Sequence, residues 1–320
     1  MKSIFLSLAL LYSCTKIPTE KGNEAIQPVA QLSKPTLVIL GNVQDAGSPH
    51  IACTKDCCSS LFAEPDNSRK VVSLGVIDPA NNKKFLFEAT PDMPEQLKLL
   101  KSYLPNNSSE TPDGIFLTHA HIGHYAGLMY LGKEAMNATN MNVYAMPRMT
   151  GYLKENGPWS QLVSTGNISL QPIEDRQAVT LTSNVRVEPF LVPHRDEFSE
   201  TVGYKIIGPS KSALFIPDID KWEKWGISIT DAIKEVDYAF VDATFFDGDE
   251  VNNRDISEIP HPFVIESMSL FDALTPDQKQ KVWFIHFNHT NPLLDLKSDQ
   301  SLKVQSAGFN IARINDAFPL

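Results

Sequence analysis

Six of the eight histidines stand in three short segments, and each segment follows a run of apolar residues. The first segment, residues 118–124, reads Thr-His-Ala-His-Ile-Gly-His, and the other two contain His194 and the pair His286 and His289. A lone histidine is usually an ordinary polar residue. Three within six residues at a strand end can converge on one metal ion. The sequence therefore predicts metal ligands at His119, His121 and His124.

Three cysteines are crowded into residues 53–58, which read Cys-Thr-Lys-Asp-Cys-Cys. Three thiolates this close can form most of a tetrahedral zinc site, with Asp56, His50 or a distant side chain as the fourth ligand. One disulfide with a spare thiol and three buried thiols are the alternatives, because adjacent cysteines rarely bridge each other. We expect structural zinc at Cys53, Cys57 and Cys58.

The first residues have the pattern of a secretion signal. Residues 1–13 begin with Met-Lys-Ser, continue with an apolar stretch too short to span a bilayer, and end in Tyr-Ser before Cys14. Leu-Tyr-Ser-Cys resembles a bacterial lipobox, in which the signal is cut before a cysteine that is then lipidated. Residues 14–35 are polar, as a tether would be. We expect a lipoprotein anchored through Cys14 on the extracytoplasmic side of a membrane; a buried first helix or strand is the alternative.

The elements that must position the histidines alternate between short apolar runs and helical patterns. Strands are predicted at residues 36–40, 71–78, 84–88, 114–117, 185–192, 202–207, 212–216, 238–241 and 282–286. Helices are predicted near residues 94–103 and 125–136 and within residues 220–236. Strand-rich halves that are each followed by helices favour an α/β fold in which two sheets pack face to face with helices outside. We expect a single domain over residues 36–320.

The motifs and their order resemble the metallo-β-lactamase superfamily. Residues 119–124 match its H-x-H-x-D-H motif except at Gly123, and His194, Asp218 and His286 stand in segments that follow in the family's order. The resemblance implies a four-layer αβ/βα sandwich. It also implies one metal site at His119, His121 and His194, and a second at His124, His286 and Asp218, with Asp218 able to bridge both ions.

Gly123 is the one departure from that motif, because the family has an aspartate there that ligates the second metal. The resemblance therefore leaves the second site short of one carboxylate. The first site, with three imidazoles, suits Zn²⁺, whereas two imidazoles and a carboxylate also suit Fe(II) or Mn(II). We expect one or two divalent ions, with zinc favoured, and we expect Gly123→Asp to tighten metal binding at the second site.

A narrower resemblance is to the coenzyme PQQ synthesis protein B group of the same superfamily. It rests on residues 41–49, which read Gly-Asn-Val-Gln-Asp-Ala-Gly-Ser-Pro before the cysteines, and on residues 285–292, which read Ile-His-Phe-Asn-His-Thr-Asn-Pro. Residues 259–261 and 266–268 are a further stretch that we interpret as lining a pocket. The paired histidines His119 and His121 distinguish this chain from that group, so we expect a relative with different chemistry.

Several other polar residues are candidates for supporting roles. His261 and His289 lie outside the six-ligand set, and each is either a proton donor to a leaving group or an ordinary polar residue. Asp45 is expected either to orient a ligand histidine or to cap a turn, and Asp242 to orient a ligand histidine, with neither binding metal itself. Asp218 is preferred over Asp220 as the ligand. Trp222 and Trp225 are interpreted as core residues.

Composition restricts the function further. The net charge of -10 disfavours binding to nucleic acid, because no basic surface is evident to offset it. The leading hypothesis is a hydrolase in which a metal-activated hydroxide attacks a small ester, lactone, amide or phosphodiester-like substrate. An iron-dependent oxidase or hydroxylase, as the narrower resemblance suggests, and a non-catalytic metal-binding lipoprotein are the alternatives. The oligomeric state is left open.

Overall fold

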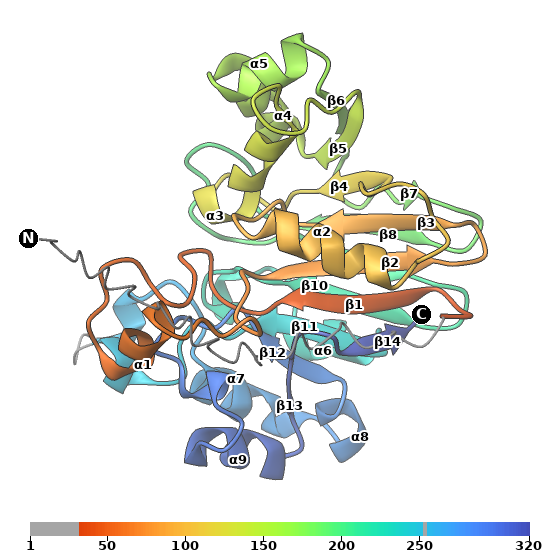
Figure 1. Cartoon of the computed structure of the whole chain (residues 1–320). Coiled ribbons are helices and arrows are strands. Elements are labelled where there is room, and N and C mark those ends of the chain that lie inside the picture. The colour runs from red at the N-terminus through yellow and green to blue at the C-terminus, as the bar shows by residue number, and fades with distance from the viewer. Residues whose placement is uncertain (1–31, 252–254) are drawn as a thin grey trace, which may run out of the picture.

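The computed structural model describes residues 32–251 and 255–320. The predicted signal and Cys14 lie outside these residues. Each of two mixed sheets has seven strands (Figure 1). The first sheet has the spatial order β14 (Ala317–Pro319), β1 (Thr36–Gly41), β2 (Ser73–Asp78), β3 (Lys83–Phe87), β4 (Gly114–Phe116), β5 (Met141–Ala145) and β6 (Ile168–Pro172). The second has the order β13 (Asn310–Ile311), β12 (Val282–Ile285), β11 (Tyr238–Asp242), β10 (Ser212–Ile216), β9 (Val202–Ile207), β8 (Arg186–Leu191) and β7 (Val179–Thr180).

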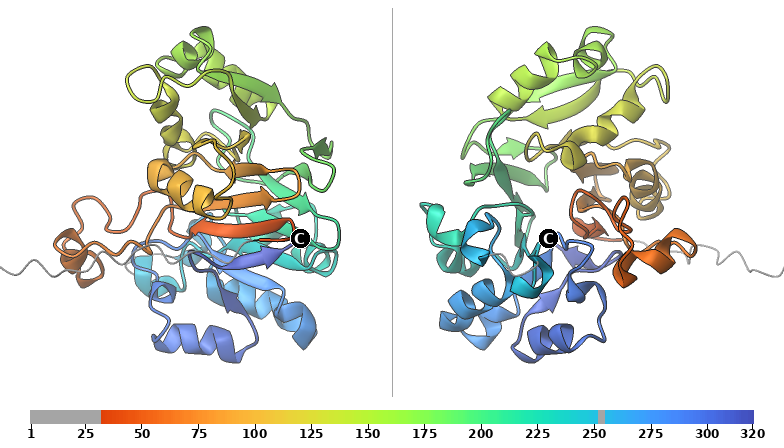
Figure 2. Two further views of the ribbon diagram at one scale, coloured as in Figure 1. Left: turned by 45° about the vertical axis from the view of Figure 1, so that its right-hand side comes forward. Right: turned by 90° about the vertical axis from the view of Figure 1, so that its left-hand side faces the viewer.

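The two sheets pack face to face because their strands alternate between two apolar faces. In β1, Leu37 and Ile39 belong to the core between the sheets, whereas Val38 and Leu40 belong to the core under the helices of the first sheet. The helices packed on that sheet include α2 (Met93–Ser102), α4 (Pro147–Glu155) and α5 (Trp159–Ser164). Those on the second sheet include α6 (Ile229–Lys234), α7 (Val264–Leu270) and α9 (Asp299–Ser306). The expected single-domain αβ/βα sandwich is confirmed (Figures 1 and 2).

One edge of this sandwich collects the ends of parallel strands. β1, β3 and β4 run in the same direction in the first sheet, as do β8, β10, β11 and β12 in the second. Parallel strands present their carboxyl ends at the same edge, where open α/β sheets place their sites. The residues that end or follow these seven strands include Asp45, Glu88, His119, His194, Asp218, Asp242 and His286.

The helix predicted over residues 125–136 is shorter than expected. The structure has α3 (Ile122–Tyr125) and then a 3-10 segment, Ala126–Leu131. The cause is backbone pairing with the segment after β3, since Gly127 donates its N–H to the carbonyl of Ala89 at 2.8 Å. A Cβ at Gly127 would lie 2.2 Å from the carbonyl oxygen of Thr90, so only glycine permits this approach.

Candidate metal centre

The loop after β4 places two histidines against a buried aspartate. Nε2 of His119 lies 2.8 Å from Nδ1 of His121 and 3.4 Å from Oδ2 of Asp218, which follows β10. Nε2 of His194, after β8, lies 3.2 Å from the other oxygen of Asp218, without the geometry of a hydrogen bond. Ligand atoms of these four residues lie within 4.8 Å of one another. We call His119, His121, His194 and Asp218 the first subsite.

A second group adjoins the first through Asp218. Ligand atoms of Asp45, His124 and His286 also lie within 4.8 Å of one another, and we call these residues the second subsite. Nε2 of His124 is 3.7 Å from Oδ2 of Asp218, the same oxygen that faces His119. Asp218 therefore stands between the subsites, in the bridging place that the motif order implies. The carboxylate of Asp45, which we expected to orient a ligand histidine or to cap a turn, lies in this group of candidate ligand atoms.

The ring orientations fit metal binding. Nδ1 of three histidines contacts an oxygen: Thr118 at 2.8 Å for His119, Asp220 at 3.2 Å for His194, and Thr244 at 2.9 Å for His286. Such contacts fix a ring and leave Nε2 for a metal ion. Within the described residues, the buried Nε2 atoms of His124, His194 and His286 have no hydrogen-bond partner. Buried polar atoms without partners are costly, so this donor set fits divalent cations.

Electrostatics favour the same conclusion. Burial and the nearby His124 ring lower the pKa of His119 well below its usual value, which favours the neutral form that metal binding requires. Burial raises the pKa of Asp218, but His261 and His194 outweigh it and hold the pKa well below the usual range. Burial also opposes protonation of His124, yet Glu88, Asp45 and Asp218 raise its pKa to about 9. A dense set of carboxylates thus faces the imidazoles and would balance cationic charge.

Glu88 is a site residue that the sequence analysis missed. It is fully buried, and its Oε2 lies 3.4 Å from Nδ1 of His124. Glu88 and His286 have positive φ angles of 74° and 70°, a region that costs energy for residues other than glycine. Glu88 contacts His124, and His286 belongs to the second subsite. Backbone strain at both positions indicates that the requirements of the site, rather than stability, determine these two conformations. The available signal was a charged residue directly after an apolar strand that ends at this edge.

His261 and Asp242 form a layer behind the bridging aspartate. Nδ1 of His261 donates to Asp242 at 2.9 Å and lies 3.2 Å from Oδ1 of Asp218. Burial lowers the pKa of His261, but the carboxylates of Asp242 and Asp218 outweigh it and raise the pKa well above its usual value. The His261 ring lies 5.4 Å from the His194 ring and 6.3 Å from the His286 ring. His261 thus lies buried next to both subsites, and the two carboxylates favour its protonated form. Asp242, Asp218 and His261 also form a group whose ligand atoms lie within 4.8 Å of one another. Asp220 contacts Nδ1 of His194 at 3.2 Å and the Lys224 ammonium at 3.0 Å.

The cysteines form a separate cluster with His289. Nδ1 of His289 lies 3.5 Å from Sγ of Cys57 and 3.3 Å from Sγ of Cys58, and Cys53 completes a group within 4.8 Å. All three cysteines are free thiols, which disfavours the disulfide alternative. His289 therefore lies where the distant fourth ligand of a zinc site would stand, and its Nδ1 faces the thiols. His50 packs on the His289 ring at 4.6 Å but is outside the group.

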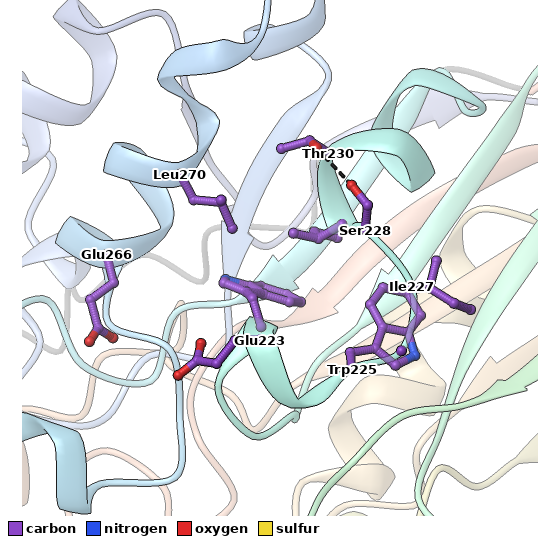
Figure 3. Close-up of a pocket in the computed structure, with 10 residues that line it drawn as sticks. Glu223, Trp225, Ile227, Ser228, Thr230, Glu266 and Leu270 are labelled. Atoms are coloured by element: carbon purple, nitrogen blue, oxygen red, sulfur yellow. Dashed lines mark hydrogen bonds between the residues drawn. The ribbon is translucent and has the colours of Figure 1, made fainter.

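Trp222 and Trp225 are buried, as expected of core residues. They line a hollow together with Glu223, Glu266 and Leu270 (Figure 3). Nε1 of Trp222 donates to Ser267 at 2.9 Å, and Nε1 of Trp225 donates to the carbonyl of Leu191. No ligand candidate lines this hollow, so it is distinct from the metal centre.

Comparisons with known proteins agree with this architecture. The family described as "Beta-lactamase superfamily domain" matches residues 83–287. Coenzyme PQQ synthesis protein B from Xanthomonas euvesicatoria is 22% identical over 304 residues, covering 86% of this chain and 97% of the relative. The protein of the same name from Methylobacterium radiotolerans is 25% identical over 302 residues, with the same coverage.

Solved structures share the fold. Zn²⁺-bound PqqB from Methylobacterium extorquens superposes with a TM-score of 0.72 at 21% identity, covering 89% of this chain and all 100% of that one. A diphosphatase of the PhnP family gives a TM-score of 0.60 at 21% identity, covering 90% and 99%. With the family match over residues 83–287, these likenesses lead to one conclusion. The chain belongs to the β-lactamase superfamily and is similar, within it, to coenzyme PQQ synthesis protein B.

Proposed function

We propose that the protein is a metal-dependent hydrolase acting on a small ester, lactone, amide or phosphodiester-like substrate. The observation that carries this proposal is the pair of adjoining subsites around Asp218, in which three buried Nε2 atoms lack partners. Divalent ions at such a pair supply Lewis acidity and lower the pKa of water. The three imidazoles of the first subsite suit zinc.

The protein's own residues would handle charge and protons. Asp218 is held ionised between the subsites and would keep the two ligand sets aligned. His261, whose Nδ1 faces Asp242 and Asp218, would in its protonated form give a proton to a departing alkoxide or stabilise negative charge on the substrate. Its position next to rings of both subsites supports this role.

A second candidate function is oxidation at an iron centre. The second subsite consists of two histidines and one carboxylate from Asp45, a set that suits non-haem Fe(II). Similarity to coenzyme PQQ synthesis protein B favours keeping this alternative.

Metal analysis followed by a substrate screen distinguishes the candidates. The domain from residue 35 onward is purified with its native metals, counted per chain, and assayed with ester, lactone, thioester and phosphodiester substrates with and without oxygen. Turnover independent of oxygen supports hydrolysis, and turnover that consumes oxygen with iron bound supports oxidation. Bound metal without turnover of any substrate would favour the non-catalytic alternative.

A further inference from the structure

Asp45 reaches the second subsite from a loop remote in sequence from the histidine motif. Its carboxylate lies in one group with His124 and His286. The loop begins at the end of β1, whereas His124 lies in α3 after β4 and His286 follows β12. Three strand ends therefore supply one ligand atom each, without any contribution from position 123.

Backbone hydrogen bonds hold Asp45 next to His286. Val43 forms an isolated β-bridge with Phe287, the residue directly after His286. Gln44 donates its N–H to the carbonyl of Phe287 at 2.8 Å, and Phe287 donates to the carbonyl of Asn42 at 2.8 Å. The Gln44 side-chain amide also donates to Oδ1 of Asp45. These contacts fix the loop and restrict the carboxylate, as expected of a prearranged ligand.

Gly123 occupies the position where the superfamily motif has its aspartate, and Asp45 fills the space beside it. A Cβ at Gly123 would lie 2.2 Å from Cβ of Asp45, 2.5 Å from its carbonyl oxygen and 2.7 Å from its Cα. These are backbone and near-backbone atoms, which cannot swing away like the end of a flexible side chain. An aspartate at position 123 and the observed loop are therefore mutually exclusive.

We propose that Asp45 is a metal ligand of the second subsite and replaces, from the β1 loop, the aspartate that Gly123 lacks. The inference rests on the proposed metal centre and deepens it. With Asp45, the second subsite has two imidazoles and its own carboxylate besides the shared Asp218. Glycine at position 123 is then required, because any Cβ there would collide with Asp45.

The test is metal binding rather than activity. Wild type, Asp45→Asn, His286→Ala and His119→Ala are titrated with zinc alone against a competing chelator, and bound metal is counted per chain. Asp45→Asn removes the charge at nearly unchanged size, and Glu64→Gln, an exposed carboxylate on the same loop, is the matched control. We expect Asp45→Asn to weaken the equivalent that His286→Ala removes by roughly tenfold or more, while the equivalent lost in His119→Ala stays unchanged.

Wild-type affinity at both equivalents in Asp45→Asn would overturn the ligand assignment while leaving the proposed function standing. A wild-type protein that binds no metal outside the cysteine cluster would overturn both. Substitutions at position 123 give a second measurement. Contrary to the expectation from the motif, Gly123→Asp should weaken the second equivalent, and so should Gly123→Ala, because either Cβ collides with Asp45. Tighter metal binding in Gly123→Asp would contradict the proposal.

Discussion

The histidines of this protein are used almost entirely for two polar clusters. Five belong to the two subsites, His261 lies behind Asp218, and His50 and His289 pack with tilted rings beside the cysteines. The ring centroids of His119 lie 4.4 Å from His121 and 4.3 Å from His124. Imidazoles this close repel each other when protonated, and buried nitrogens without partners cost free energy. The cluster is therefore unfavourable for stability unless cations bind, and metal binding should stabilise the fold.

The first prediction concerns the ligands of the first subsite. His119→Ala or His194→Ala should remove one metal equivalent and lower turnover by roughly 100-fold or more, because a lost imidazole leaves the subsite one ligand short. Metal per chain, turnover and circular dichroism would be measured for each variant. His50→Ala is the control, since it removes a ring outside both subsites. Unchanged metal content in both ligand variants would contradict the assignment.

Two loops each contain residues of both the second subsite and the cysteine cluster. The loop after β1 contains Asp45 and the cysteines, and the loop after β12 contains His286 and His289. The β1 loop, with α1 (Asp56–Ser59), projects from the same end of the sheets as α3 (Figures 1 and 2). A metal at the cysteine cluster would join the loops a few residues from the second subsite. Its removal should therefore affect both the stability of the β1 loop and the second subsite.

The second prediction tests this connection. Cys57→Ser should lose the structural zinc, lower the melting temperature by several degrees, and weaken metal binding at the second subsite more than at the first. The physical reason is that a free loop no longer holds Asp45 in place. Zinc counts, calorimetry and chelator titration would show it. Ser59→Ala, at the end of α1, is the matched control. If Cys57→Ser keeps its full zinc content, the cysteine cluster is not a metal site.

Strand prediction succeeded where apolar residues run between turn signals, as in β1, β3 and β10. It missed β5, whose residues alternate in burial, and β6, which is only partly buried. The helix α4 was not predicted either, because the residues after Pro147 at its first turn are a short mixture of polar and apolar side chains. Local sequence patterns do not predict which segments add strands to a sheet, since that depends on tertiary packing.

The site was predicted unevenly for a related reason. His119, His121 and His124 are adjacent in sequence, so their spacing alone pointed to an ion. Asp45 and Glu88 act through strands that meet only in three dimensions, and a single carboxylate after a strand is common. That Asp45 takes the place of an aspartate at position 123 could not be predicted from local sequence, because it depends on a backbone contact between segments about 80 residues apart.

At the scale of the whole molecule, the attachment of the chain to a membrane stays a prediction, because Cys14 lies outside the described residues. Among the residues that the structure does describe, no helix is long and apolar enough to cross a bilayer. If the lipid on Cys14 is the anchor, Cys14→Ser should leave an unlipidated protein that fractionates with soluble extracytoplasmic material. Cell fractionation with a high-salt wash would measure this, with Ser13→Ala as the control. Membrane association of Cys14→Ser that survives the wash would reject the lipid anchor.

The two sheets are also joined at the edge far from the metal centre. Asp78 ends β2 of the first sheet and accepts hydrogen bonds from Asn81 at 2.7 Å and from two residues before β8 of the second sheet, Thr182 at 2.6 Å and Asn184 at 3.3 Å. Burial raises the pKa of Asp78, but these donors outweigh it and lower the pKa below its usual value. The carboxylate therefore fastens the two halves of the sandwich.

The last prediction follows from the sign of that shift. A carboxyl group whose pKa is lower in the folded protein stabilises the fold above its unfolded pKa of about 3.9, and this contribution is lost as pH falls through the folded pKa. Asp78→Asn should thus cost roughly 1.5–3 kcal/mol of unfolding free energy at pH 7, the size of hydrogen bonds to a charged group, and less at pH 3. Denaturant unfolding of wild type, Asp78→Asn and the control Glu64→Gln at both pH values would measure it. Metal content should stay at the wild-type value, because Asp78 lies at the opposite edge. An equal cost at both pH values would show that the charge of Asp78 does not hold the sheets together.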